Sequence, residues 1–296
     1  MQKTPKGFEI PLANPDLKGN EANYALEAIQ SGWIGTGPFI KRFEAEFARL
    51  SGARAAVACA NGTVALHLAF RAMGLAPGDE VILPSFTYVA TANAVRLCGA
   101  EPVFVDVDPH TWCIDPERVE QSITLRTKGI VPVDLYGHPA DLDSINRLAN
   151  IYGLWVVEDA AEAALARYKQ RPVGGIAQIT TFSFHITKVF TSGEGGAVTM
   201  NDEKLEAFIR MICSHGMDPT RRFFFPVSGY NYRLTNISAG LLCAQIELAS
   251  GRRGHDVVND VIVILEDQSI SLFDRDRCLR KQFVLLQDGL LGSKGR

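Results

Sequence analysis

Seven short apolar runs predict buried strands. The segments between them have the spacing of amphipathic helices, and over 40–50 the residues Ile40, Phe43, Phe47 and Leu50 share one helix face. Because the apolar runs are nearly continuous rather than alternating, they are typical of strands covered on both faces. Strands alternating with helices predict an α/β fold with a mostly parallel central sheet covered by helices. The strands are expected at 55–60, 80–83, 102–107, 129–133, 154–158, 179–184 and 196–200, and further helices at 64–73, 89–98, 141–151 and 203–213.

Two segments break this alternation. Residues 32–38 form a glycine-rich loop, and residues 215–232 are rich in loop signals. After position 248 the pattern changes, with an apolar run from Val257 to Leu265 but no clear series of strands. We therefore predict an N-terminal arm at 1–15, a large α/β domain at 16–247 and a divergent tail at 248–296.

Composition narrows the class of protein. The formal net charge of −3 argues against a nucleic-acid binder held by bulk electrostatics, and 47% apolar with 21% charged residues is typical of a soluble globular chain. No apolar stretch is long enough for a membrane span, and the N-terminus has no signal-peptide pattern. The six cysteines lack metal-site spacing. We expect a cytoplasmic protein with buried, reduced thiols, no membrane contact and no metal.

The first candidate site follows the strand at 55–60. Asn61, Gly62 and Thr63 open the next helix, where free backbone N–H groups and the helix dipole favour a phosphate. An ordinary helix N-cap would have the same sequence, so this stretch alone does not decide between the two.

The second candidate follows the strand at 154–158. Glu158, Asp159 and Glu162 lie where the carboxyl end of a buried strand meets the edge at which open α/β sheets bind ligands. A carboxylate in that position needs a cationic partner, although a helix cap is the alternative interpretation.

The third candidate is Lys188, just after the strand at 179–184 and followed by a glycine-rich stretch to Gly196. Partial desolvation there favours the neutral, nucleophilic amine. A surface lysine on a loop is the alternative.

Together these stretches resemble the sugar aminotransferases of the DegT/DnrJ/EryC1/StrS family, the pyridoxal 5'-phosphate (PLP) enzymes related to perosamine synthases. The resemblance runs from about Pro11 to about Glu247. It rests on six stretches in the family's order, 32–38, 61–68, 84–91, 158–163, 183–196 and 229–236.

The resemblance implies a fold-type-I aminotransferase and a role for each matching residue. Lys188 would form a Schiff base with PLP and carry the proton between cofactor and substrate, and Asp159 would pair with the pyridine nitrogen. Glu162 would lie near the cofactor's phenolic oxygen, where many relatives have glutamine and where a glutamate needs a donor or a proton. The remaining roles fall to Gly62, Thr63 and Ser183 on the phosphate, Tyr88 on the ring face, and Asn231 on the phosphate of a neighbouring subunit in a homodimer.

The resemblance also suggests the reaction. Related sugar dehydratases have histidine in place of the Schiff-base lysine, so Lys188 favours transamination. The expected partners are an amino-acid donor, glutamate, and a keto-sugar nucleotide, most simply a 4-keto-6-deoxy sugar. Two alternatives stay open: a non-catalytic PLP-binding paralogue or scaffold partner, and a PLP enzyme acting on a cyclitol ketone.

The tail departs from the family pattern. From about Leu248 the match stops, where relatives continue into a small C-terminal domain. A frameshift or truncation predicts such an abrupt end, and a divergent short domain is the alternative. On the first interpretation we expect a less stable chain with weak or no transaminase activity.

Overall fold

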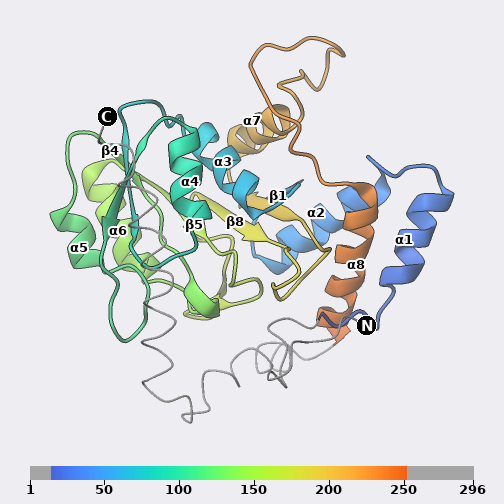
Figure 1. Cartoon of the computed structure of the whole chain (residues 1–296), viewed down its shortest axis with the longest axis horizontal. Helices are drawn as coiled ribbons and strands as arrows, with labels where there is room; N and C mark the ends of the chain where they lie inside the picture. The colour runs from blue at the N-terminus through green and yellow to red at the C-terminus, as the bar shows by residue number, and fades with distance from the viewer. Residues whose placement is uncertain (1–14, 252–296) are drawn as a thin grey trace, which may run out of the picture.

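A seven-stranded sheet forms the centre of the chain (Figure 1). The computed structural model describes residues 15–251, and within them the strand order is β1-β9-β8-β5-β4-β2-β3. Each of the seven apolar runs is a strand, which confirms that part of the prediction. The strands are β1 (Ala55–Cys59), β2 (Glu80–Pro84), β3 (Glu101–Val105), β4 (Thr127–Ile130), β5 (Trp155–Asp159), β8 (Ile179–Ser183) and β9 (Gly196–Met200).

Most neighbouring strands run parallel. The pairs from β3 through β2, β4 and β5 to β8 are parallel, and β9 is antiparallel to both β8 and β1. The expectation of a mostly parallel sheet is therefore confirmed. The carboxyl ends of the parallel strands meet at one edge, where α/β sheets bind ligands.

The strand β3 corrects one detail of the prediction. The run at 102–107 was expected to be a buried strand, but β3 lies at the edge of the sheet, with Glu101 exposed and Phe104 38% exposed. Within the described chain β3 pairs only with β2, so one of its sides is left open. An apolar run therefore predicts that a strand forms, but it does not predict whether that strand lies at the centre or at the edge of the sheet.

Eight α-helices accompany the strands within residues 15–251. Five correspond to predicted helices, whereas α1, α5 and α8 were not predicted, and neither was the small β6 (Arg167–Tyr168) and β7 (Arg171–Pro172) hairpin. A short 3-10 turn covers Leu135–Gly137. The helices are α1 (Glu21–Gln30), α2 (Pro38–Leu50), α3 (Gly62–Ala72), α4 (Ala90–Leu97), α5 (Pro116–Gln121), α6 (Leu142–Tyr152), α7 (Glu203–Cys213) and α8 (Asn236–Gly251).

The helices cover both faces of the sheet. Successive strand residues point to opposite faces, so Val57 of β1 packs with α3, α4 and α7, whereas Ala56 packs with α2 and α8. On the second face the ring of Phe47 meets Phe182 of β8 edge-on at 4.9 Å. Further along that face, α5 and α6 pack against β2, β4 and β5. This arrangement confirms the prediction of helices on both sides of the sheet.

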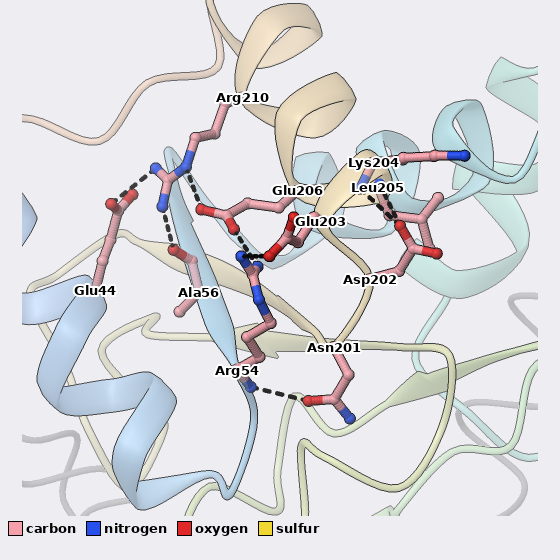
Figure 2. A network of polar contacts seen from close by, with 10 residues as sticks. All are labelled: Glu44, Arg54, Ala56, Asn201, Asp202, Glu203, Lys204, Leu205, Glu206 and Arg210. Carbon is pink, nitrogen blue, oxygen red and sulfur yellow. Dashed lines mark hydrogen bonds and ion pairs between the residues drawn. The ribbon is translucent and has the colours of Figure 1, made fainter.

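Side chains cap the free edge of β1 (Figure 2). Arg210 of α7 donates to the carbonyl of Ala56 at 3.0 Å. Glu44 of α2 accepts the N–H of Ala58 at 2.9 Å. Arg210 also pairs with Glu44 at 2.8 Å. This ion pair links α2 to α7, and its two side chains bond to the N–H of Ala58 and the carbonyl of Ala56 on β1. An edge strand left unpaired is a template for aggregation, and these contacts remove part of that template.

Several predictions concern the chain as a whole. Cys59, Cys98, Cys113, Cys213 and Cys243 are buried free thiols, and Cys278 lies outside the described residues. Within 15–251 no helix is long and apolar enough to span a bilayer.

Two of the predicted segments lie outside the described residues. They are the N-terminal arm apart from Pro15 and the tail from 252, which includes the Val257–Leu265 run. The domain limit at 247 falls within α8, which continues to Gly251, and that limit stays a prediction.

Candidate active site

Lys188 and Glu162 form an ion pair at the carboxyl edge of the sheet. Lys188 lies on the loop between β8 and β9, and its Nζ is 3.0 Å from Oε1 of Glu162. The lysine side chain is only 19% exposed. The other oxygen of Glu162 accepts the backbone N–H of Tyr136 at 2.8 Å. Each oxygen of the Glu162 carboxylate therefore accepts from a donor, one from the Lys188 amine and the other from the Tyr136 N–H.

Asp159 is the last residue of β5 and is 5% exposed. Its Oδ2 accepts the hydroxyl of Thr91 on α4 at 2.7 Å, and its Oδ1 accepts the N–H of Ala161 at 3.2 Å. Burial raises the pKa of this carboxyl, while the two hydrogen bonds and the charge of Lys188 act in the opposite direction. Asp159 and Lys188 thus interact electrostatically at one site.

The start of α3 lies against the end of β8. Asn61 caps the helix, because its Oδ1 accepts the N–H of Val64 at 3.0 Å. Within the described chain the N–H groups of Gly62 and Thr63 bond to no acceptor. A Cβ on Gly62 would lie 2.7 Å from the Cβ of Ser183, so a side chain there would displace β8. Free amides at a helix N-terminus beside a serine are suited to an anion.

For two of the predicted site residues the described chain shows no side-chain hydrogen bond to this group. Tyr88 precedes α4, with a 71% exposed side chain, and its carbonyl accepts the N–H of Thr91. Asn231 lies between α7 and α8, where it forms a β-bridge with Ser214, and its Oδ1 accepts from Arg233. The structure thus brings together Lys188, Glu162 and Asp159, and separately Gly62 and Ser183.

Sequence reasoning missed three groups that support these side chains. Thr91 holds Asp159, Tyr136 donates to Glu162, and Asp134 donates its backbone N–H to the carbonyl of Asp159 at 3.0 Å. The sequence did contain a sign of the role of Thr91, because Thr87 and Thr91 are four residues apart near the start of α4. Residues with this spacing lie close together, and the two hydroxyls are 3.2 Å apart in the structure. The other two act through their backbones, which no residue type reveals.

The acidic residues here are not arranged as a metal site. Among residues 15–251 no cluster of histidine, cysteine, aspartate or glutamate has the arrangement of metal ligands. Amide, hydroxyl and ammonium groups instead occupy the acceptor positions of Asp159 and Glu162.

Comparisons with known proteins agree with this geometry. The chain is 51% identical over 239 residues to a GDP-perosamine synthase of Caulobacter vibrioides, covering 80% of this chain and 64% of that protein. It is 45% identical to a UDP-2-acetamido-2-deoxy-3-oxo-D-glucuronate aminotransferase of Pseudomonas aeruginosa, covering 79% and 67%. The solved structure of NtdA from Bacillus subtilis with bound PMP superimposes with a TM-score of 0.76 at 33% identity, covering 83% and 58%.

The match covers most of this chain but less of its relatives. The chain spans 64% of the length of the Caulobacter protein and 66% of a GDP-perosamine synthase of Escherichia coli O157:H7. The model of the DegT/DnrJ/EryC1/StrS aminotransferase family, whose cofactor is PLP, matches residues 15–254 and so includes the whole described sheet and its candidate site. From the fold, the site and these matches together, the chain belongs to the DegT/DnrJ/EryC1/StrS aminotransferase family.

Proposed function

We propose that this chain is a PLP-dependent aminotransferase that moves an amino group from glutamate to a keto-sugar nucleotide. One observation carries the proposal: a largely buried lysine amine lies 3.0 Å from one carboxylate and interacts with the buried carboxyl of Asp159. That combination supplies an amine nucleophile and a partner for a cationic ring nitrogen at a single site.

The residues present fit PLP. The cofactor needs an anion cradle for its phosphate, and the free amides of Gly62 and Thr63 beside Ser183 supply one, since a Cβ on Gly62 would meet Ser183. It also needs a carboxylate for the pyridine nitrogen, and Asp159 is held in place by Thr91. When bound, PLP supplies the electron sink that stabilises negative charge on the substrate carbon.

Each side chain then has a defined task. Lys188 anchors the cofactor and moves a proton to and from the substrate carbon, because its amine is the basic group at the site. Asp159 keeps a proton on the ring nitrogen. Glu162 orients the Lys188 amine and is itself fixed by the N–H of Tyr136.

Two further roles are proposed from the family resemblance. Tyr88 is exposed in this protomer and available to cover a ring face. For Asn231, on the segment before α8, we propose a contact with the phosphate of a second subunit. An active homodimer follows from this assignment.

The substrate class rests on the names of the relatives. One is named for GDP-perosamine and another for the 3-oxo form of a UDP-linked sugar. We therefore propose a keto-sugar nucleotide as the acceptor, with a 4-keto-6-deoxy sugar as the first candidate.

The test is incubation of the purified chain with PLP, glutamate and a panel of keto-sugar nucleotides, with 2-oxoglutarate release as the measurement. The panel includes GDP- and UDP-linked 4-keto-6-deoxy sugars, a UDP-linked 3-oxo sugar and a cyclitol ketone. Release with one nucleotide sugar supports the proposal, whereas release with the cyclitol alone contradicts the substrate class. PLP binding without turnover on any acceptor would instead identify a non-catalytic paralogue.

A further inference from the structure

Two fully buried carboxyls lie behind Asp159, on the opposite face of β5. Asp134 follows β4 and Glu158 belongs to β5, and both side chains have 0% exposure. Since side chains alternate along a strand, Glu158 faces the α5 and α6 side of the sheet with Val156, whereas Asp159 faces α3 and α4 with Val157. The pair is therefore separate from the Lys188 group.

Within 15–251, each carboxyl of the pair has one oxygen with a donor and one without. Asp134 accepts the N–H of Ala140 at 3.0 Å through Oδ1, and Glu158 accepts the hydroxyl of Thr180 at 2.7 Å through Oε2. The second oxygen of each carboxyl has no donor among the described residues. The backbone places the two residues side by side, since Val133 pairs with Asp159 and the N–H of Asp134 donates to the carbonyl of Asp159. One proton shared between the two carboxyls would satisfy both remaining oxygens.

The backbone ties this pair to Asp159. The N–H of Asp134 donates to the carbonyl of Asp159 at 3.0 Å, and the N–H of Asp159 donates to the carbonyl of Pro132 at 2.9 Å. Glu158 is the residue directly before Asp159 in the strand. Any movement of the carboxyl pair is therefore transmitted to the backbone that carries Asp159.

The surroundings favour a single negative charge on the pair. Within residues 15–251 neither carboxyl forms a salt bridge with a cation. The charge of Asp159 acts on both, and Asp134 in turn acts on the Cys113 thiol. Burial raises the pKa of Glu158 to about 7 and that of Asp134 well above its ordinary value, with the Glu158 charge adding to the second shift. Cys113 stays neutral, since burial and then Asp134 raise its pKa to about 12.

We propose that Asp134 and Glu158 share one proton as a positioning pair, which fixes the strand end carrying Asp159 and holds one negative charge behind it. The charge favours a cation at Asp159. This second part rests on the proposed function, in which Asp159 faces the ring nitrogen of PLP. The first part concerns the protein alone.

Replacing a carboxyl with an amide removes its titratable proton but keeps its size and shape, so the two effects can be measured separately. In Asp134→Asn the amide can donate to Glu158 while its oxygen still accepts from Ala140, and in Glu158→Gln the amide can donate to Asp134. Each single variant keeps the hydrogen bond and the single charge but loses the proton that titrates. The double variant removes the charge, and in it the hydroxyl of Thr180 must turn to accept from the new amide at position 158 so that the two amides can bond to each other. Asp134→Ala removes the hydrogen bond.

The first readout is the free energy of unfolding of the chain without added PLP, measured against pH from 5 to 7. In wild type the folded pair retains a proton that ordinary carboxyls have lost above pH about 4, so stability falls as pH rises. The free energy of unfolding should fall more steeply with pH in wild type than in either amide variant. The difference in slope should correspond to at most one bound proton. Parallel profiles, or Asp134→Asn being as unstable as Asp134→Ala, would overturn the shared proton.

The second readout is the absorbance of bound PLP, titrated with pH. Both single amide variants should titrate like wild type, and the double variant should titrate at lower pH because a negative charge near the cationic cofactor is gone. A double variant that titrates like wild type contradicts the electrostatic role. If wild type binds no PLP, the proposed function fails while the unfolding measurement still decides the pair.

Discussion

Asp159 is a buried carboxyl whose charged form depends on its neighbours. Burial alone disfavours the charge, and the hydroxyl of Thr91, the N–H of Ala161 and the ammonium of Lys188 favour it. This balance is what a partner for a cationic ring nitrogen requires. A weaker set of donors would leave the carboxyl protonated and unable to hold a cation.

Replacing Asp159 with asparagine should leave PLP binding intact and lower kcat by on the order of 10² or more. The amide fits the same space and can still accept from Thr91, but it cannot keep a proton on the ring nitrogen. Steady-state kinetics with glutamate check this, with Thr91→Val as the companion variant, for which a smaller loss is expected. Near-normal turnover of Asp159→Asn would assign the role to another group.

Individual residues were easier to predict from the sequence than their contacts. Lys188, Asp159 and Glu162 were each predicted from strand ends and from family resemblance, and the structure places Lys188 against Glu162. The support from Tyr136 could not be predicted, because it is a backbone N–H contributed by a residue with φ of 52°. The Asp134–Glu158 pair was missed because its two members are far apart in sequence, Asp134 on the loop after β4 and Glu158 on the adjacent strand β5.

Among the elements, strands were predicted better than helices. All seven apolar runs are strands, since a buried strand needs only a short apolar stretch between turn signals. The helix α8 escaped prediction because it is apolar around most of its surface, with Leu242, Cys243 and Ile246 buried against α2 and its neighbours. A helix covered on several sides shows no polar face and hence no clear period.

The cap on β1 predicts an effect on stability. In Arg210→Ala the buried carboxylate of Glu44 loses its cation and the carbonyl of Ala56 loses a donor. We expect a loss of about 1–3 kcal/mol in the free energy of unfolding at pH 7. The matched control is Arg54→Ala, whose partner Glu203 is 77% exposed, and we expect a smaller loss from it than from Arg210→Ala.

The pH dependence of the same variant has a defined sign. Burial already raises the pKa of Glu44 above its ordinary value of 4.5, and removing Arg210 raises it further. In the folded variant Glu44 therefore takes up a proton more readily. The difference in free energy of unfolding between wild type and the variant should shrink as pH falls from 7 toward 4.5. Urea unfolding at several pH values measures this, and a deficit that grows toward low pH would contradict the assignment.

At the scale of the whole molecule, Asn231 is the predicted site residue that we assign to a neighbouring subunit. Asn231 accepts from Arg233 on the segment before α8, and within the described chain it makes no contact with Lys188 or Asp159. We expect a homodimer in which this segment completes the partner's phosphate site. Sedimentation should show at least a dimer, and Asn231→Ala should raise the Kd for PLP roughly tenfold, a change of about 1.4 kcal/mol. A monomer that holds PLP tightly would refute this assembly.

The central claim is that Lys188 carries the cofactor. The direct measurement is borohydride reduction of the purified chain with PLP, followed by peptide mapping by mass spectrometry. The account predicts one modified peptide, containing Lys188, and no modification in Lys188→Ala. A label on a different lysine, or equal labelling of Lys188→Ala and wild type, would contradict it.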